Sequence, residues 1–373
     1  MSAKRILITG GAGFVGSHLS DALLTDGHEV RVLDSLSAQV HPNGLPAYLN
    51  REVEFLRGDV RDRGALERAL GGVDVVYHEA AAVGVGQSMY QIEEYMSCNT
   101  QATALLLQVL LDKKIPIEKL VVASSMSIYG EGQYACDRCG KVAPGPRPTE
   151  QLRARDWEVH CPVCDSALEP VPTTEEKPLQ ATSVYALSKK DQEEICLLFG
   201  RTYGLPVVAL RYFNIYGTRQ ALSNPYTGVA AIFASRLLNN KPPVIFEDGD
   251  QMRDFVSVHD VVRANLLALN MDKANGRALN IGSGSPITIR EVASALALNL
   301  GRRIEPEISA QYRAGDIRHC YADITAAREA LGYEPQHSFQ QGIAEFVEWL
   351  RPQQAVDRGE EMMQELKAFG LSV

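Results

Sequence analysis

Tyr185 and Lys189 are the residues whose types and spacing point most directly to chemistry. They stand four residues apart in Tyr185-Ala-Leu-Ser-Lys189, so a helix would present both on one face. A nearby ammonium group lowers the pKa of a tyrosine, which makes a phenolate base possible near neutral pH. A hydroxyl-rich segment, residues 124–130, follows an apolar stretch that predicts a strand, and open α/β sheets bind ligands at the carboxyl ends of their strands. The sequence therefore predicts a tyrosine base and serine hydroxyls at one ligand site.

A glycine-rich turn, Gly10-x-x-Gly13-x-x-Gly16, lies between a predicted strand and a predicted helix. We expect Gly10 to allow a tight turn, Gly13 to let the backbone approach a pyrophosphate, and Gly16 to let the helix pack on the strand. The helix would offer unpaired N–H groups and the positive end of its dipole to the phosphates. Asp34 ends the next predicted strand, where a carboxylate binds the adenosine ribose and repels a 2′-phosphate. The pattern predicts bound NAD rather than NADP.

Four of the seven cysteines form two Cys-x-x-Cys pairs, Cys136 with Cys139 and Cys161 with Cys164. Four thiolates at this spacing suit a tetrahedral structural Zn²⁺ with no open coordination position, although the loop between the pairs is longer than in the usual ribbon. Free thiols and disulfides are the alternatives. The pairs lie in a segment rich in proline, glycine and charge, residues 131–171, which we interpret as an insertion that stabilises a lid or an oligomer contact. The isolated cysteines are expected to fill the core: Cys98, Cys196 and Cys320.

Apolar strands and amphipathic helices alternate over residues 4–130, which predicts right-handed βαβ crossovers and a parallel sheet. The predicted strands cover residues 5–9, 29–34, 52–57, 73–78 and 120–124. Helices are predicted over 16–26, 100–113 and 183–203, the last followed by a strand over 206–212. The final residues, 352–373, predict a polar surface helix or tail.

The fold class predicted is α/β: a Rossmann-type doubly wound parallel sheet, a smaller C-terminal substrate-binding lobe and an inserted zinc-ribbon-like knuckle. Residues 1–180 are predicted to form the NAD-binding domain and 181–373 mainly the substrate lobe and a C-terminal helix or tail. Segments near 205–218 and 254–282 are expected to return to the NAD-binding domain.

The composition excludes some classes of partner. The 373 residues are 45% hydrophobic and 22% charged, which is ordinary for a globular protein. The net charge of −9 disfavours the basic surface that nucleic acids require. We find no signal peptide and no apolar stretch long enough to span a bilayer, so no membrane partner and a cytoplasmic location are expected.

Further motifs accompany the glycine turn and the tyrosine–lysine pair in a fixed order. They are Asp59-Val60, His78–Ala82, Ser124–Gly130, Arg211–Asn214, Arg253–Val261, Asn280–Gly284 and Arg313–Asp316. This order closely resembles the extended short-chain dehydrogenase/reductase family, and the later motifs resemble its sugar-nucleotide epimerase/dehydratase branch. The resemblance covers the chain apart from about residues 131–171 and the tail.

The resemblance implies a role for each matching residue. Tyr185 would be the base, Lys189 would anchor the nicotinamide ribose, and Ser125 would hydrogen-bond the sugar hydroxyl. The cofactor would be bound by Gly10, Gly13, Phe14, Val15, Gly16, Asp34, Asp59, Val60, Ala80, Ala81, Asn99, Tyr185, Lys189 and Tyr212. A nucleoside-diphosphate sugar would be bound by Val85, Ser125, Ser127, Asn214, Val229, Arg253, Arg313 and Asp316. The forked guanidinium groups of the two arginines suit a diphosphate, and Asp316 would bind the nucleoside ribose.

The resemblance also bears on the reaction. Members of the branch begin by oxidising a sugar to a 4-keto sugar. Its dehydratases carry an Asp-Glu pair directly after the catalytic serine or threonine, and its uronic-acid decarboxylases usually carry a glutamate where Ser127 stands. Here the two positions are Met126 and Ser127, which have no carboxyl group. This implies a 4-epimerase that keeps a tightly bound NAD between cycles.

Three questions stay open at this point. Residues 80–90 and 219–229 resemble dTDP-L-rhamnose 4-epimerases and similar bacterial enzymes, which implies dTDP-L-rhamnose or a related hexose as substrate. A UDP-glucuronate decarboxylase, a 4,6-dehydratase with substituted acid–base residues and an NAD-sensing binding protein are the alternatives, although a sensor has no need of a phenolate base. The helices around 100–113 and 185–200 resemble those that pair relatives as homodimers.

Overall fold

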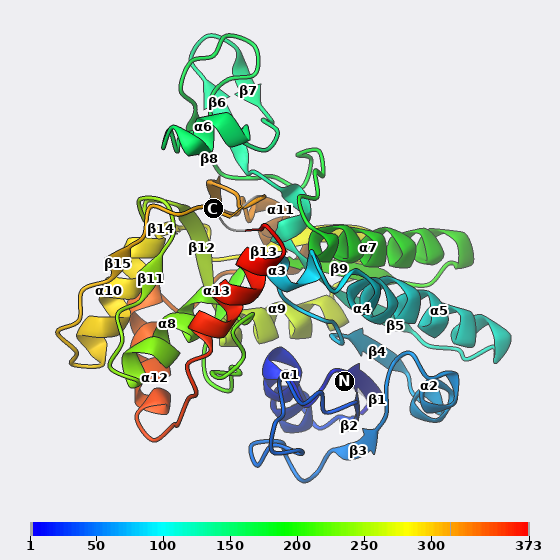
Figure 1. The fold of residues 1–373 in the computed structure, drawn as a ribbon. Helices are drawn as coiled ribbons and strands as arrows, with labels where there is room; N and C mark the ends of the chain where they lie inside the picture. Colours follow the sequence, from blue (N-terminus) through cyan, green and yellow to red (C-terminus); the bar gives the residue numbers. More distant parts are fainter. Residues whose placement is uncertain (1–2, 314, 372–373) are drawn as a thin grey trace.

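A seven-stranded parallel sheet forms the centre of the molecule, whose computed structural model describes residues 3–313 and 315–371 (Figure 1). The strand order is β13-β9-β5-β4-β1-β2-β3, and every neighbouring pair is parallel. The predicted α/β class is therefore confirmed, and each predicted strand lies within two residues of the observed bounds. The strands span Arg5–Thr9 (β1), Glu29–Asp34 (β2), Glu54–Arg57 (β3), Val75–His78 (β4), Lys119–Ser125 (β5), Val207–Tyr212 (β9) and Arg277–Ile281 (β13).

Helices cover both faces of this sheet, because βαβ crossovers place them there. Ile6 and Ile8 of β1 face one hydrophobic core and Leu7 faces the other, and all three side chains are fully buried. The first core is covered by α1 (Phe14–Thr25), α9 (Val258–Asn270) and α11 (Thr325–Leu331). The second is covered by α2 (Arg63–Leu70), α5 (Ala102–Asp112) and α7 (Val184–Tyr203).

A smaller lobe is built mainly from the chain that follows β9. In its mixed sheet, β12 pairs in parallel with β10 and β16 and antiparallel with β14. The strands of this sheet span Asn214–Tyr216 (β10), Met252–Ser257 (β12), Pro286–Thr288 (β14) and His319–Cys320 (β16). Two short strands, Val244–Ile245 (β11) and Glu307–Ile308 (β15), form a separate parallel pair. Its helices, which share a third core, are Val229–Leu238 (α8), Ile289–Asn299 (α10) and Phe339–Leu350 (α12).

The insertion between β5 and α7 folds into a small unit of its own, which projects from one end of the molecule in Figure 1. It has an antiparallel sheet of order β7-β6-β8 and a core formed by Tyr134, Val159, Leu168 and the paired cysteines. Its elements span Gln133–Cys136 (β6), Gly140–Val142 (β7), Thr149–Arg153 (α6) and Glu169–Val171 (β8).

The C-terminal segment departs from the expected surface tail. Helix α13 (Gly359–Ala368) runs across the front of the molecule, between the small lobe and α3 (Val85–Ser88) (Figure 1). Its Met362 and Leu366 are buried because they pack against Tyr226. The remaining short helices are α4 (Ile92–Tyr95), a π-helix (Met96–Gln101) and 3₁₀ turns at Met126–Tyr129 and Asp272–Ala274. No helix in the described ranges is long and apolar enough to cross a membrane.

Candidate active site

One large cavity, of about 1330 Å³, lies where the carboxyl ends of the central strands face the small lobe. It exceeds the volume of a typical site for one drug-sized ligand, which leaves room for two. With one exception, every residue that the sequence assigns to cofactor or substrate lines it: Gly10, Gly13, Phe14, Val15, Gly16, Asp34, Asp59, Val60, Ala80, Ala81, Val85, Ser125, Ser127, Tyr185, Lys189, Tyr212, Asn214, Val229, Arg253, Arg313 and Asp316.

Asn99 is the exception. Its side chain is fully buried behind the wall, where it accepts a hydrogen bond from the Ala82 N–H (2.8 Å) and donates to the Ala82 carbonyl (3.1 Å) and the Ser188 hydroxyl (2.9 Å). These contacts direct the amide toward protein atoms instead of a ligand in the cavity. Asn99 therefore fixes the backbone that follows β4 and holds it against α7.

The glycine turn after β1 has the geometry of a cradle for a dinucleotide. Gly10 has a φ of +69°, and a Cβ atom there would lie 2.8 Å from the backbone of Ala80. A Cβ on Gly16 would lie 2.6 Å from the backbone of Gly10 and Gly11, so only glycine allows α1 to approach β1 this closely. Gly13 caps α1 without a side-chain hydrogen bond, which leaves the helix N–H groups facing the cavity. These residues fit an NAD pyrophosphate.

Asp34 sits at the carboxyl end of β2, beside this turn. Its carboxylate accepts hydrogen bonds from the N–H groups of Ala12 (3.0 Å) and Leu36 (2.8 Å), and the side chain lines the cavity. Two oxygens offer about four acceptor sites, so lone pairs remain for a ribose. The fixed negative charge at this place favours a ribose diol over a 2′-phosphate.

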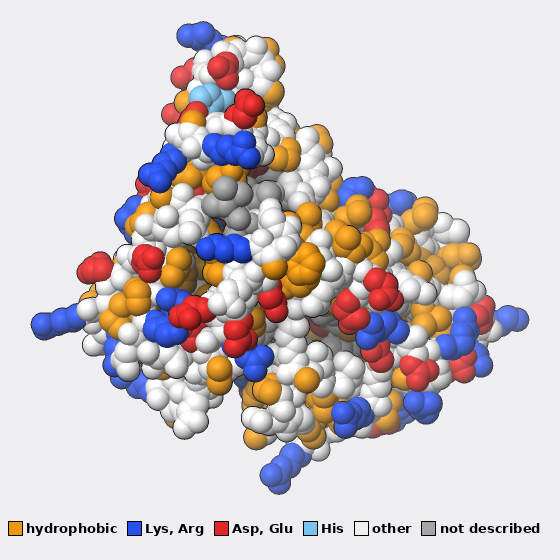
Figure 2. All heavy atoms as spheres, in the orientation of Figure 1, with side chains coloured by type: hydrophobic (Ala, Val, Ile, Leu, Met, Phe, Trp, Pro, Cys, Tyr) orange, Lys and Arg blue, Asp and Glu red, His pale blue; other side chains and the backbone are white. Residues whose placement is uncertain are grey.

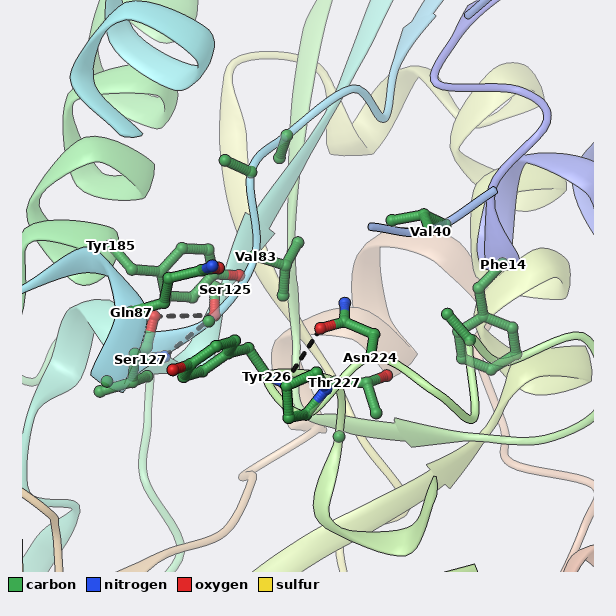
Figure 3. A pocket seen from close by; sticks show the side chains of 18 of the residues that line it. Phe14, Val40, Val83, Gln87, Ser125, Ser127, Tyr185, Asn224, Tyr226 and Thr227 are labelled. Carbon is green, nitrogen blue, oxygen red and sulfur yellow. Dashed lines mark hydrogen bonds between the residues drawn. The ribbon is translucent and has the colours of Figure 1, made fainter. Parts of the chain in front are cut away.

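Tyr185, Ser125 and Ser127 come together at the ends of β5 and α7 (Figure 3). The Ser127 hydroxyl donates to the Ser125 hydroxyl (2.9 Å), which also accepts from the Ser127 N–H (3.2 Å). Burial raises the pKa of Tyr185, whereas its hydrogen bond with Ser125 lowers it. The arrangement suits a proton transfer between a ligand hydroxyl, Ser125 and the phenol.

Lys189 departs from the expectation that its ammonium lowers the pKa of Tyr185. The Lys189 ammonium donates to the Ala123 carbonyl and to Gln192 rather than to the phenol, and burial lowers its own pKa to about 8. Burial therefore dominates the pKa of Tyr185 in the structure. Helical spacing brought the two residues to one face but did not determine which group the ammonium would contact.

A buried ion pair fixes α7 against the sheet beneath the site. Arg211 of β9 binds the Glu193 carboxylate through two of its nitrogens, and the Ser124 hydroxyl at the end of β5 donates to the same carboxylate (2.6 Å). Because Glu193 lies two turns after Tyr185 on α7, this contact sets the distance between Tyr185 and the serine turn.

The small lobe contributes polar groups to the lining of the cavity, which are Asn214, Arg253, Arg313 and Asp316. The Asn214 side-chain oxygen is buried without a partner among the described residues. The Arg313 guanidinium binds Asp316 (2.8 Å) and lies 4.7 Å from the centre of the Phe246 ring. Cationic, amide and aromatic groups at one end suit a nucleoside diphosphate. Ala314, named in the same sequence motif, lies outside the described residues.

Sequence reasoning missed a polar bridge over the cavity. The Gln39 amide donates to the side-chain oxygens of Gln87 and Asn224 (3.0 Å each), and the Tyr95 hydroxyl also donates to Gln87 (3.0 Å). Gln87 and Asn224 belong to the two stretches compared with bacterial epimerases, but Gln39 stands in a loop without a motif. Figure 3 shows Gln87 and Asn224 at opposite sides of Val83.

Sequence reasoning also missed the contribution of α13. Glu365 accepts hydrogen bonds from the hydroxyls of Tyr90 (2.7 Å) and Tyr226, and Met362 and Met363 line the cavity. No local pattern marks this helix as part of a site. Its role depends on two tyrosines far away in the sequence.

The four paired cysteines of the insertion form a cluster whose sulfur atoms all lie within 4.8 Å of one another. The Cys136 and Cys164 sulfurs are 3.6 Å apart. Tetrahedral zinc with Zn–S bonds of about 2.3 Å separates its sulfur ligands by about 3.8 Å, so the donor set and spacing fit this ion. Cys98, Cys196 and Cys320 lie apart from the cluster, and Cys196 and Cys320 are buried in the core as expected, whereas Cys98 lines the cavity.

Two family models match the chain. One, described as the NAD dependent epimerase/dehydratase family, matches residues 6–149, and the other, described as GDP-mannose 4,6 dehydratase, matches residues 167–346. The residues left between the two matches, 150–166, belong to the insertion.

Individual relatives match over nearly their whole length. The dTDP-L-rhamnose 4-epimerase of Burkholderia thailandensis is 34% identical over 362 residues, which cover 96% of this chain and 97% of the relative. The UDP-glucose 4-epimerase of Thermotoga maritima, solved with UDP-glucose, superposes with a TM-score of 0.76 and 32% identity over 93% of this chain and 98% of that one. The UDP-glucose 4-epimerase of Thermus thermophilus, solved with NAD, superposes with a TM-score of 0.74 and 32% identity over 93% of this chain and 99% of that one.

Proposed function

The chain belongs to the NAD-dependent epimerase/dehydratase family, and from this premise we propose that it inverts the C4 configuration of a nucleoside-diphosphate sugar. The relatives named above are 4-epimerases of dTDP- or UDP-linked hexoses. The cavity is lined by the glycine cradle, by the serine–tyrosine pair and by the arginines of the small lobe, and this combination suits such a reaction.

NAD bound along the glycine cradle would supply a hydride acceptor that takes hydrogen from C4 and returns it to the opposite face. Tyr185 would accept the proton of the C4 hydroxyl, directly or through Ser125, and give it back when the 4-keto sugar is reduced. Lys189 would hold the nicotinamide ribose, and Tyr212 would form part of the cofactor wall. The nucleoside diphosphate would be held by Asn214, Arg253, Arg313 and Asp316 while the sugar rotates and presents its other face to the cofactor.

The observation that favours epimerisation over related reactions is the pair that follows Ser125. Met126 and Ser127 form the start of a 3₁₀ turn beside the tyrosine and carry no carboxyl group. Elimination of water from the sugar needs an acid and a base at this position, and a serine hydroxyl is too weak an acid and base to replace them. Without that pair, we propose that the 4-keto sugar is reduced again by return of the hydride.

Incubation with dTDP-L-rhamnose, UDP-glucose and UDP-glucuronate, followed by proton NMR, tests the proposal. We expect a 4-epimer from one of the three, and we name dTDP-L-rhamnose because the relative from Burkholderia thailandensis covers almost the whole chain. Val83, Val85 and Met126 line the cavity and would give a 6-deoxy position an apolar wall. A 4-keto-6-deoxy product or a pentose would instead place the enzyme among dehydratases or decarboxylases.

We also propose that the cysteine cluster binds one structural Zn²⁺ and that the insertion is thereby a zinc-ribbon-like knuckle. Elemental analysis should find about one zinc per chain, as four thiolates in a closed tetrahedral site imply. Cys161→Ser should lose the zinc, and Cys98→Ser, which changes a thiol outside the cluster, should retain it. Less than half an equivalent in the purified wild type would contradict the assignment.

We propose that the enzyme works in the cytoplasm as a homodimer paired through α5 and α7. Hydrophobic side chains gather over this part of the surface in Figure 2. On α7, Leu187 and Leu198 are 43% and 56% exposed, and Tyr203 is 58% exposed. Large exposed apolar side chains along one helix support a protein interface.

A further inference from the structure

The base of the insertion lies directly behind the nucleotide end of the cavity. From this contact we infer that Arg147 and Glu131, two residues of the insertion, position the groups that bind the nucleoside diphosphate. The inference rests on the proposed nucleotide-sugar substrate. It assigns the insertion a part in substrate affinity that its protruding shape does not suggest.

Arg147 joins two segments of the small lobe. Its guanidinium binds both oxygens of the Glu247 carboxylate (2.7 and 3.0 Å) and also donates to the backbone carbonyl of Asp316 (3.1 Å). Glu247 follows Phe246, the ring over which the Arg313 guanidinium lies. One side chain of the insertion therefore holds the Asp316 backbone and the turn that carries Phe246 at a fixed separation.

Glu131 acts on the other side of the same segment. Its carboxylate accepts a hydrogen bond from the Arg318 N–H (2.8 Å). The carbonyls of Arg318 and Ile317 in turn accept hydrogen bonds from the Arg253 guanidinium (2.8 and 2.6 Å). A carboxylate of the insertion thus fixes the peptide that orients Arg253 toward the cavity.

The charges of this network are almost completely removed from water. Glu131, Arg147, Glu247 and Arg318 are between 1% and 7% exposed. Arg318 links them further by binding Glu247 (3.2 Å) and Asp248 (2.6 Å). A buried charge that loses its partner is costly, so the backbone must move when one member changes. The segment that would move first carries Arg313 and Asp316.

Among the described residues, Arg147 and Glu131 are absent from the lining of the cavity, so they can reach a ligand only through their neighbours. They are positioning residues rather than binding residues. A change in either should weaken the binding of a nucleoside diphosphate while the proton-transfer groups stay in place. KM should rise while kcat changes little.

Titration of the NAD-loaded enzyme with dTDP and with UDP in a calorimeter tests the inference. Arg147→Lys keeps the charge but cannot bind Glu247 and the Asp316 carbonyl together, so Kd for the nucleoside diphosphate should rise about tenfold, the loss of one charge-assisted hydrogen bond. Arg153→Lys changes an exposed arginine of the same insertion and should leave Kd unchanged. The NAD content should be equal in all three proteins.

Glu131→Gln provides a second variant with the same shape, in case Arg147→Lys does not fold. It should raise Kd in the same direction. A wild-type Kd in whichever of the two variants folds would overturn the inference, as would an equal loss of NAD and nucleotide, which indicates general unfolding. A wild type that binds neither dTDP nor UDP would instead refute the proposed function.

Discussion

At the scale of single residues, the hydroxyl of Tyr185 is the group on which we propose that turnover depends. We expect Tyr185→Phe to lower kcat by about 10²–10⁴, the usual contribution of a general base. The enzyme should keep its NAD because the ring still fills the same space. Tyr203→Phe removes an exposed hydroxyl from the same helix and serves as the control. Proton NMR of the product measures kcat, and release of the cofactor by denaturation measures the NAD content. Substantial turnover by Tyr185→Phe would contradict the assignment.

The lowered pKa of Lys189 predicts the alkaline side of the pH profile. Burial disfavours the charged ammonium and lowers its pKa to about 8, so the charge is present below this pH and is lost as the pH rises through it. We therefore expect kcat/KM to fall above about pH 8, because a neutral amine binds the ribose hydroxyls less strongly. Initial rates across neutral and alkaline pH, in buffers of constant ionic strength, measure this. A flat alkaline profile would show that bound ligands keep Lys189 charged.

Single residues also show what the sequence could predict. The sequence could predict that the glycine turn, the serine turn and the tyrosine line one cavity, because a short motif encodes the local geometry that places them there. The sequence did not predict that the Asn99 side chain points away from the cavity, since its direction depends on Ala82 and Ser188 in two other segments. The predicted shift in the pKa of Tyr185 was wrong in direction, because burial raises this pKa and a sequence motif does not reveal burial.

At the scale of elements, helix α13 is the part of the site that most needs testing. Leu366 is 1% exposed and Glu365 binds Tyr226 and Tyr90, so the helix holds the segments at residues 90 and 226 together across the cavity. Leu366→Ala removes a buried side chain, which costs ~2–5 kcal/mol. We expect the helix to detach locally and NAD to dissociate at least about tenfold faster, as a weakening of about 1.4 kcal/mol already implies.

Loss of NAD during repeated gel filtration, followed by absorbance, measures this retention. Val356→Ala, which truncates an exposed side chain shortly before the helix, should behave as the wild type. Equal retention by Leu366→Ala would mean that α13 packs beside the cavity without closing it.

The strand bounds, unlike the role of α13, were predictable from the sequence to within two residues, because buried parallel strands are continuous apolar runs.

At the scale of the whole molecule, the exposed apolar face of α7 predicts the oligomeric state. Leu198→Glu places a charge in the proposed interface and should halve the mass measured by light scattering. Leu298→Glu alters a side chain that is 79% exposed on α10 of the other lobe, and this variant should remain a dimer. A monomeric wild type, or a dimer that survives Leu198→Glu, would exclude this face as the interface.

The position of the insertion between β5 and β9 has a consequence for how such a chain can change over evolution. These two strands are neighbours in the sheet, and residues 131–171 make up about half of the chain that connects them. Closure entropy grows only with the logarithm of loop length, so doubling this connection costs about 0.6 kcal/mol. A metal-binding unit could therefore be gained here almost without penalty to folding. Once Arg147 and Glu131 had formed buried contacts with the small lobe, however, the unit could no longer be deleted without loss, because the Arg318 N–H would lose its acceptor and the buried Glu247 carboxylate would lose one of its two arginine partners. The acquisition would then be hard to reverse.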